Sequence, residues 1–319
     1  MNKLLIICGP TATGKTSLGI YLAKKLNGEI VSADSRQVFK KMDIGTGKDI
    51  PKGSVYKKVS KKLGGYYEFG DVKIWGYDLV FPEEEYSVAQ YSSFAREVIK
   101  DIHKRNKFPI IVGGTGFYIK SVVEGIGTAE IPQNKALRKN LTKIPKDELF
   151  EKLAILDSSR AGSLNQSDKN NPRRLFRAIE IATWRLSNLG NENKQKKLNY
   201  DLLFIGLNAP RQILSKRIKE RIEIRVKGVK KEISSLLKQG VDWSFQSMSS
   251  LGYRQWKDYF EGKETEQKAI EKWFSEEKRY SKRQITWFKK KKDIIWYSVN
   301  SHGWMENVEK FVQKWYSSG

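Results

Sequence analysis

A glycine-rich loop near the N-terminus limits what this chain can fold into more than any other feature. The loop begins at Gly9 and matches the pattern G-x-x-x-x-G-K-[ST]. An apolar run from Lys3 to Cys8 precedes it, and leucines at helical spacing follow it as far as Gly28. A loop between a strand and a helix turns its backbone N–H groups toward phosphate oxygens. We therefore expect a chain of two or three phosphates to be bound by Gly9, Pro10, Thr11, Ala12, Thr13, Gly14, Lys15 and Thr16.

Two side chains of the loop add a cation and a metal ligand. Lys15 supplies a positive charge, and the hydroxyl of Thr16 suits Mg²⁺. Cys8 is the only cysteine, which excludes an internal disulfide and a cysteine-rich zinc site and fits a reducing compartment. We therefore predict Mg²⁺ as the cofactor, with Thr16 as its protein ligand, and a buried, unreactive Cys8.

Apolar runs alternate with helical patterns along most of the chain. Ser87 and Gln90 form a capping box that begins one of the helices. Between Ala33 and Ser87 we expect a long irregular stretch. Strands that alternate with helices predict an α/β protein with a P-loop NTPase-like, doubly wound parallel sheet. The further strands are expected at Glu29 to Ala33, Phe108 to Val112, Leu202 to Leu207 and Ile294 to Val299.

One segment breaks this alternation. Residues 132–198 are polar, helix-prone and poor in strand signals, which predicts an inserted helical domain. Residues 1–131 and 199–319 then form the P-loop catalytic core and its C-terminal helices. The chain has no run of 18 apolar residues and no signal peptide at its start. We expect a soluble, cytoplasmic monomer that makes no membrane contact.

Positive charge is in excess and unevenly placed. The chain has 60 Lys and Arg against 36 Asp and Glu, a net charge of +24. Nine basic and two acidic residues fall between Arg211 and Lys231, and eight basic and no acidic residues between Lys278 and Lys292. Clusters of this kind concentrate polyanions, which favours a nucleic-acid partner over a general lysine bias.

An acidic residue follows one of the expected strands. The strand from Phe108 ends in Gly113-Gly114-Thr115 and offers no carboxylate. Asp34 instead follows the strand from Glu29, and a parallel sheet brings that strand end to the same edge as the phosphate loop. From this position alone, Asp34 is a Mg²⁺ ligand, a general base or the N-cap of the next element.

Six segments together point to one family. Since the phosphate loop is shared by many activities, the informative segments are Asp-Ser-Arg-Gln, Gly-Gly-Thr-Gly and Lys-Arg-Gln-x-Thr-Trp. Over nearly its whole length the sequence resembles the bacterial-type tRNA dimethylallyltransferases. The segments that carry the resemblance are, in order, the phosphate loop, Ser32-Ala-Asp-Ser-Arg-Gln-Val38, Met42-Asp-Ile-Gly-Thr46, Val112-Gly-Gly-Thr-Gly-Phe-Tyr118, Gly252-Tyr-Arg-Gln255 and Lys282-Arg-Gln-Ile-Thr-Trp-Phe288.

The resemblance implies a reaction and three catalytic residues. A dimethylallyl group would pass from dimethylallyl diphosphate to the exocyclic amine of the adenosine on the 3′ side of a tRNA anticodon, with release of diphosphate. Asp34 would take the amine proton, Thr115 would bond near the target adenosine, and Arg221 would clamp the diphosphate.

The resemblance also implies a contact surface for the anticodon stem-loop and makes the inserted helical domain, residues 132–198, a tRNA-binding domain. The strip after Asp34 is expected to line the base pocket, and the arginines of the run from Arg173 are expected to point outward. Trp287 and Phe288 can stack on bases, but their helical spacing from Trp273 favours the core. The implied tRNA-binding residues are Asp34, Ser35, Arg36, Gln37, Arg138, Arg173, Arg174, Arg177, Ser249, Gly252, Tyr253, Arg254, Lys282, Arg283 and Gln284.

The sequence departs from the family in one segment, and other functions retain part of the pattern. Many relatives carry Pro-His-His-Leu-x-Asp where this chain reads Lys73-Ile-Trp-Gly-Tyr-Asp78, without histidine. A P-loop kinase of a nucleotide or small metabolite would keep the loop and Mg²⁺. An adenylate isopentenyltransferase acting on free nucleotides would keep the same chemistry, and a nucleotide-gated RNA-binding module would keep the basic surface.

Overall fold

The chain forms two compact units. The structure, a computed structural model, describes residues 2–60, 63–128, 131–188 and 199–318. Unit 1 comprises Met1–Glu124 and Leu198–Gly319, and unit 2 comprises Gly125–Lys197. The segment that interrupts unit 1 therefore begins at residue 125, whereas the sequence analysis places the start of the insertion at residue 132.

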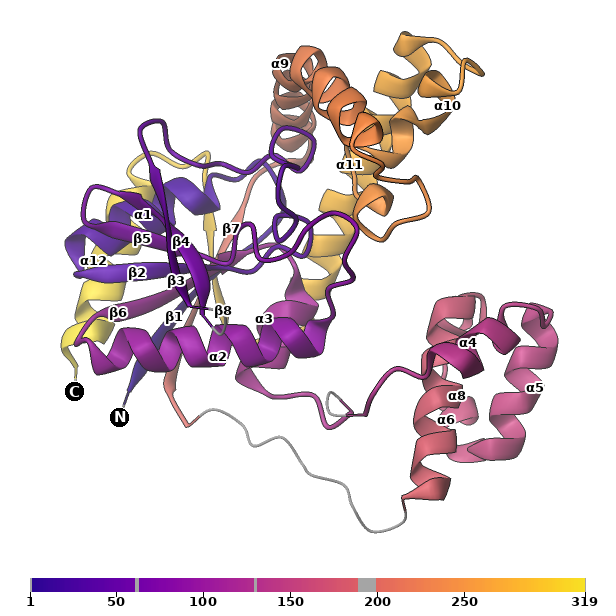
Figure 1. Ribbon diagram of the computed structural model, residues 1–319. Coiled ribbons are helices and arrows are strands. Elements are labelled where there is room, and N and C mark those ends of the chain that lie inside the picture. The colour runs from indigo at the N-terminus through magenta and orange to yellow at the C-terminus, as the bar shows by residue number, and fades with distance from the viewer. Residues whose placement is uncertain (1, 61–62, 129–130, 189–198, 319) are drawn as a thin grey trace. The chain divides into compact units, whose positions relative to one another are not determined.

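Unit 1 is built on an eight-stranded, mostly parallel sheet (Figure 1). The first strand, β1, lies in its interior and pairs in parallel with β6 and β7. The expected α/β fold with a parallel sheet is confirmed. In spatial order the strands are β3 (Val55–Ser60), β4 (Gly64–Phe69), β5 (Val72–Trp75), β2 (Gly28–Ser32), β6 (Phe108–Gly113), β1 (Lys3–Cys8), β7 (Asp201–Asn208) and β8 (Ile294–Ser298).

The expected irregular stretch between Ala33 and Ser87 is wrong. Three strands lie within it: β3 and β4 pair antiparallel, β4 and β5 pair antiparallel, and β5 joins β2 in parallel. All six residues of β3 are exposed, so this edge strand has no buried face. Period-two hydrophobic alternation arises only when one face is buried, and the sequence therefore carries no such signal here.

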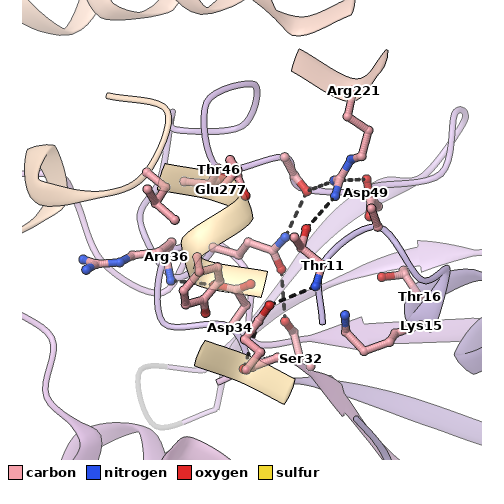
Figure 2. A pocket seen from close by; sticks show the side chains of 18 of the residues that line it. Thr11, Lys15, Thr16, Ser32, Asp34, Arg36, Thr46, Asp49, Arg221 and Glu277 are labelled. Atoms are coloured by element: carbon pink, nitrogen blue, oxygen red, sulfur yellow. Dashed lines mark hydrogen bonds and ion pairs between the residues drawn. The ribbon is translucent and has the colours of Figure 1, made fainter. Parts of the chain in front are cut away.

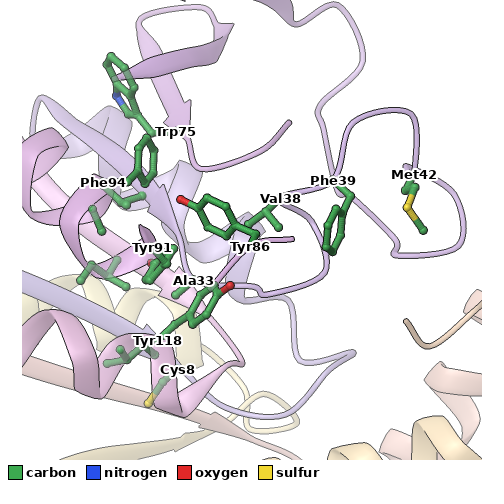
Figure 3. Packing of buried hydrophobic residues seen from close by; sticks show 14 of the residues in the cluster. Cys8, Ala33, Val38, Phe39, Met42, Trp75, Tyr86, Tyr91, Phe94 and Tyr118 are labelled. Atoms are coloured by element: carbon green, nitrogen blue, oxygen red, sulfur yellow. The ribbon is translucent and has the colours of Figure 1, made fainter. Parts of the chain in front are cut away.

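Helices cover both faces of the sheet in unit 1. Helices α1 (Lys15–Lys25) and α12 (Trp304–Ser317) contribute to the core on one face, with Leu18 and Val308 packed against the strands. The core of the other face holds Cys8, and Tyr91 of α2 stacks there on Tyr118 of α3 with ring centroids 3.9 Å apart (Figure 3). The remaining elements of unit 1 are α2 (Val88–Lys104), α3 (Gly116–Val123), α9 (Arg211–Lys238), η1 (Ser247–Ser249), η2 (Arg254–Trp256), α10 (Lys257–Phe260) and α11 (Glu266–Phe288).

Two local predictions are confirmed in unit 1. Ser87 accepts the Gln90 backbone N–H while Gln90 accepts the Ser87 backbone N–H, so the capping box begins α2. Cys8 is fully buried, and burial raises the pKa of its thiol to about 12. It therefore packs as a small apolar side chain and has almost no thiolate at neutral pH.

Helices are the only regular secondary structure in the described residues of unit 2, 125–128 and 131–188. It has a separate apolar core that includes Leu141, Leu153 and Leu175. Across the described part of the whole chain, no helix combines the length and apolarity that a membrane span needs. The helices of unit 2 are α4 (Lys135–Leu141), α5 (Lys146–Leu156), α6 (Ser158–Gly162), α7 (Gln166–Lys169) and α8 (Pro172–Ser187).

Candidate active site

A cavity of about 700 Å³ opens in unit 1 beside the phosphate loop. Its walls come from segments that are far apart in the sequence, including the loop after β2 and the helices α9 and α11 (Figure 2). The residues after β2 and β6 reach it because both strands are parallel to β1 and end at the same edge of the sheet. The predicted residues that line it are Thr11, Ala12, Gly14, Lys15, Thr16, Asp34, Arg36, Gln37, Arg221, Ser249, Arg254, Arg283 and Gln284.

Gly9, Pro10 and Thr13 belong to the phosphate loop but do not line the cavity. Gly9 has φ +136°, and a Cβ there would overlap the carbonyl oxygen of Leu207, so only glycine fits. Thr13 is buried, and its hydroxyl donates to the Pro10 carbonyl at 2.9 Å. These contacts fix the shape of the loop that α1 continues.

Lys15 lies folded onto its own loop. Its ammonium group donates to the Pro10 carbonyl oxygen at 2.6 Å. Burial lowers the pKa of Lys15 to about 8, and the nearby charge of Asp34 partly opposes that shift. A buried cation of this kind gains most from an anion that enters the cavity.

Arg221 reaches the phosphate loop from α9. Its guanidinium donates to the Thr11 hydroxyl at 3.1 Å and pairs with Asp49, also at 3.1 Å. Arg217, one helical turn earlier, donates to the Ala12 carbonyl at 3.4 Å. The predicted clamp on the diphosphate is therefore positioned beside the loop, and α9 closes that side of the cavity.

Asp34 lies partly buried in the same cavity. One carboxylate oxygen accepts the Arg36 backbone N–H at 2.9 Å, which closes a turn after β2. Among the described residues no helix lies between the end of α1 at Lys25 and the start of α2 at Val88, so Asp34 is not a helix N-cap. Burial raises the pKa of Asp34, although the Arg36 N–H and the charge of Lys15 lower it. The carboxylate is consequently a stronger base than an exposed aspartate.

Thr115 connects the ends of β2 and β6. Its hydroxyl accepts the Ser35 backbone N–H at 3.1 Å, and its own N–H donates to the Ala33 carbonyl. Neither Thr115 nor Ser35 lines the cavity. Gln37 does line it, and its amide donates to the Gly47 carbonyl at 3.0 Å. Thr115 therefore holds the strip from Asp34 to Gln37 in place.

Gln284 is buried and serves the phosphate loop. Its side-chain oxygen accepts the Thr11 N–H at 2.9 Å, and its amide nitrogen donates to the Gly114 carbonyl at 3.0 Å. Both ends of the amide are used inside unit 1, and the contact of Gln284 with tRNA stays a prediction. Lys282 and Arg283 precede it on α11 and are exposed.

Gly252 and Tyr253 are also structural. Gly252 has φ +89°, and a Cβ there would overlap the Gly45 carbonyl. Tyr253 is fully buried and donates its hydroxyl to Glu232, whose carboxylate accepts the Gly45 N–H at 3.0 Å. The predicted tRNA contact is wrong for Tyr253, because its hydroxyl is used to secure the loop around Gly45.

Two arginines of unit 2 are paired within that unit. The carboxylate of Glu180, which is buried, accepts from Arg138 at 2.7 and 2.8 Å and from Arg177 at 3.2 Å. Arg177 also donates to the carbonyls of Thr128 and Ile131. The expectation that the arginines of this run point outward is wrong for Arg177. Arg173 and Arg174 are exposed, and Arg174 pairs with Asp168.

Trp287 and Phe288 of α11 were both expected in the core, which is confirmed for Phe288 and wrong for Trp287. Phe288 is 3% exposed, whereas Trp287 is 43% exposed. The buried stripe of α11 includes Trp273, Gln284 and Phe288. Trp287 lies one position off this stripe and reaches the surface.

The cavity also holds residues that the sequence analysis missed. Asp49, Tyr77 and Tyr280 line it. Tyr77 stands in the segment that lacks the histidine pair of many relatives, and it bonds to the Ser32 and Thr16 side chains. Burial raises the pKa of Tyr77, so its phenol stays neutral. The absence of the histidine pair from the segment Lys73 to Asp78 was the one sequence feature that could have pointed to Tyr77.

The oxygen atoms near Thr16 are the candidate metal ligands. Ser32, Asp34 and Asp49 line the same cavity as Thr16. Within the described ranges, no group of three or more His, Cys, Asp or Glu residues is arranged to hold a metal ion. A cation held mainly by protein side chains is therefore not supported by the described residues.

Together the sheet, the loop and the cavity define a protein with a P-loop NTPase-like fold. The family model described as IPP transferase matches residues 37–291, and the model described as Isopentenyl transferase matches residues 2–56. The chain belongs to the IPP transferase family.

Individual relatives agree with this assignment. The tRNA dimethylallyltransferase of Anoxybacillus flavithermus is 37% identical over 301 residues, 93% of this chain and 91% of the relative. The full-length tRNA isopentenylpyrophosphate transferase of Bacillus halodurans is 31% identical with a TM-score of 0.68, covering 98% of this chain and 96% of that chain. A eukaryotic dimethylallyltransferase acting on tRNA shares the fold, with a TM-score of 0.77 at 24% identity over 98% of this chain and 78% of that chain.

Proposed function

We propose that this protein transfers a dimethylallyl group from dimethylallyl diphosphate to the exocyclic amine of the adenosine 3′ of a tRNA anticodon, releasing diphosphate. One observation carries the proposal: the cavity joins a phosphate loop, with Lys15 and Arg221, to a basic carboxylate, Asp34. To alkylate an amine, an enzyme must stabilise the departing leaving group and accept the proton of the amine. Membership of the IPP transferase family favours prenyl transfer over phosphoryl transfer.

The phosphate loop receives the leaving group. Its backbone N–H groups, Lys15 and Arg221 surround the position where negative charge grows as the carbon–oxygen bond breaks. Mg²⁺ fits this site, because an oxygen-only donor set with one hydroxyl, Thr16, suits a metal held largely by phosphates and water. When bound, Mg²⁺ neutralises charge on the departing diphosphate.

Asp34 takes the proton. The lone pair of an adenine amine is delocalised into the ring, so the amine attacks well only if its proton leaves as the bond forms. The nitrogen bonds to the first carbon of the dimethylallyl group, the bond from that carbon to the diphosphate oxygen breaks, and the amine proton passes to Asp34. A positioned base typically contributes about 10²–10⁴-fold.

The acceptor is an RNA. Exposed cations are present on both units, at Arg173 in unit 2 and at Lys282 and Arg283 in unit 1. An adenosine in a folded loop must leave its stack to enter the cavity, and phosphate contacts help to offset that cost. A tRNA substrate leads us to propose a cytoplasmic location, and a monomer remains our prediction.

The experiment mixes the protein with Mg²⁺, labelled dimethylallyl diphosphate and unmodified tRNA that carries adenosine beside the anticodon, with AMP and ATP as parallel acceptors. Label on tRNA is the expected result. Label only on free nucleotides would reassign the basic surface while keeping the roles of Asp34 and the loop. Phosphoryl transfer from ATP, or tRNA binding without any product, would overturn the proposal in favour of a kinase or a binding module.

A further inference from the structure

Trp287 is exposed, whereas Trp273 and Phe288 of the same helix are buried. One side of its indole lies against Gly116, where a Cβ would overlap the ring. The Phe117 ring meets it edge-on, with centroids 6.3 Å apart and an interplanar angle of 76°. The indole is therefore fixed in orientation by its neighbours while 43% of the residue stays open to solvent.

The open side of this residue belongs to a positively charged groove. The groove is about 470 Å³ in volume and contains four cations and no acid. Among the described residues, no ion pair joins Lys282, Arg283 or Lys290 to a carboxylate, whereas Arg279 pairs with Glu276. The residues that line it are Arg279, Lys282, Arg283, Thr286, Trp287 and Lys290.

This groove adjoins the reaction cavity. Arg283 lines both, and Gly114, two residues before Gly116, lines the reaction cavity. A nucleic-acid strand whose acceptor adenosine occupies the cavity therefore has its neighbouring nucleotide within reach of the groove. A fixed aromatic ring beside free cations binds an unpaired base by stacking and its phosphate by charge.

We propose that Trp287 and the cations around it form a stacking subsite for the nucleotide next to the acceptor adenosine. The inference rests on the proposed function, because it needs an RNA acceptor in the cavity. Trp287 would contribute to binding of the RNA and would not touch the reacting atoms. Replacement of Trp287 is thus expected to raise KM for RNA and to leave kcat unchanged.

The first test compares Trp287→Ala and Trp287→Phe on an anticodon stem-loop RNA at saturating dimethylallyl diphosphate. Removal of a stacking ring raises KM for RNA roughly tenfold to a hundredfold and leaves kcat within about twofold. Trp287→Phe retains most of the affinity. Phe311→Ala, an exposed aromatic residue of α12, is the matched control and leaves both constants unchanged.

The second test removes the partner base. Two stem-loops are made, each with an abasic site at one neighbour of the acceptor adenosine. With the wild-type protein, one of them weakens binding by the same factor as Trp287→Ala, and on that RNA Trp287→Ala causes no further loss. An equal loss on intact and on both abasic RNAs would overturn the stacking subsite, as would an unchanged KM for Trp287→Ala.

The same comparison is made as equilibrium binding without dimethylallyl diphosphate, so that it does not depend on product. Wild-type protein that binds RNA but transfers nothing contradicts the proposed function, while the abasic coupling still decides on the subsite. Should Trp287→Ala lower the melting temperature, the decision passes to Trp287→Phe and to wild-type protein on the abasic RNAs.

Discussion

The side chain of Gln284 joins Thr11 to Gly114. It accepts the Thr11 N–H at 2.9 Å and donates to the Gly114 carbonyl at 3.0 Å, across 273 and 170 residues of sequence. One buried amide thus aligns the phosphate loop with the end of β6. This contact gives the Lys-Arg-Gln segment of α11 two roles, because Gln284 faces inward while Lys282 and Arg283 face solvent.

Gln284→Ala is expected to impair use of dimethylallyl diphosphate and to spare RNA affinity. It leaves the Thr11 N–H and the Gly114 carbonyl without their partner, and an unsatisfied buried group costs about 1–3 kcal/mol. We expect kcat/KM for dimethylallyl diphosphate to fall roughly tenfold or more. Arg283→Ala, at the adjacent residue, is the control and should weaken RNA binding instead. Weaker RNA binding with unchanged kcat/KM for dimethylallyl diphosphate in Gln284→Ala would instead assign Gln284 to RNA binding.

Asp34→Asn is expected to lower turnover about 10²–10⁴-fold without changing the Kd for tRNA. The amide still accepts the Arg36 N–H with its oxygen, so the turn after β2 is kept and only the base is lost. Asp293→Asn, an exposed substitution, serves as the control. Retained turnover in Asp34→Asn would remove Asp34 from proton transfer.

The pH profile of the wild-type protein reports the same carboxylate. Because burial raises the pKa of Asp34, its ionised fraction declines at a higher pH than for an ordinary aspartate. Below that pKa, kcat should fall about tenfold per pH unit. An acid limb at the pKa of an ordinary aspartate, near 3.8, would contradict this assignment.

Lys15 makes diphosphate binding sensitive to alkaline pH. Burial lowers the pKa of Lys15 to about 8, so the side chain is charged below this pH and neutral above it. Affinity for inorganic diphosphate, measured calorimetrically from pH 7 to pH 9, should weaken above pH 8 by up to about tenfold per unit. Lys15→Met cannot titrate and corrects for the protonation of diphosphate itself. A constant ratio of the two affinities would show that Lys15 does not titrate in this range.

Arg173 and Arg177, four residues apart on α8, should behave differently. Arg177→Ala breaks the network around Glu180, which is buried, and should destabilise unit 2 by about 1–3 kcal/mol in a thermal melt. Arg173→Ala should leave stability unchanged. It should reduce the slope of log Kd for tRNA against log salt concentration by about one. Equal effects of the two substitutions on both measurements would mean that the network is unimportant.

The Glu180 network also predicts an acid-sensitive unit 2. Burial alone would raise the pKa of Glu180, but the bonds from Arg138, Asn134 and Arg177 lower it overall. A carboxylate with a lowered folded-state pKa stabilises the fold at neutral pH and loses that contribution as pH falls below the ordinary glutamate value near 4.5. Glu180→Gln should flatten the pH dependence of unfolding below that value.

Local patterns explain most of what the sequence analysis predicted correctly. The phosphate loop, the apolar strands and the Ser87 capping box are defined by residues within a few positions of one another. The edge strand β3 was missed because its exposed residues, such as Val55 and Val59, do not alternate with buried ones.

The site was predictable in part, for a related reason. Lys15 and Asp34 follow strands of a parallel sheet, so the topology alone brings them to one edge. The buried stripe of α11 contains polar residues, Glu277 and Gln284 among them. The pattern of apolar residues therefore does not show which side of the helix is buried, and Trp287 was wrongly assigned to the buried side. The pairing of Arg177 with Glu180 depends on burial of the carboxylate, which no sequence pattern reports.

Cys8 has a practical consequence for spectroscopy. The chain has one cysteine, fully buried in β1, and burial raises the pKa of its thiol to about 12. Thiol reagents act on thiolates, so the unmodified protein is silent toward maleimide dyes near neutral pH. A cysteine introduced by Arg173→Cys or Lys282→Cys would be the single reactive site. The double variant, which carries both, allows fluorescence energy transfer between the two units to be followed as RNA is added.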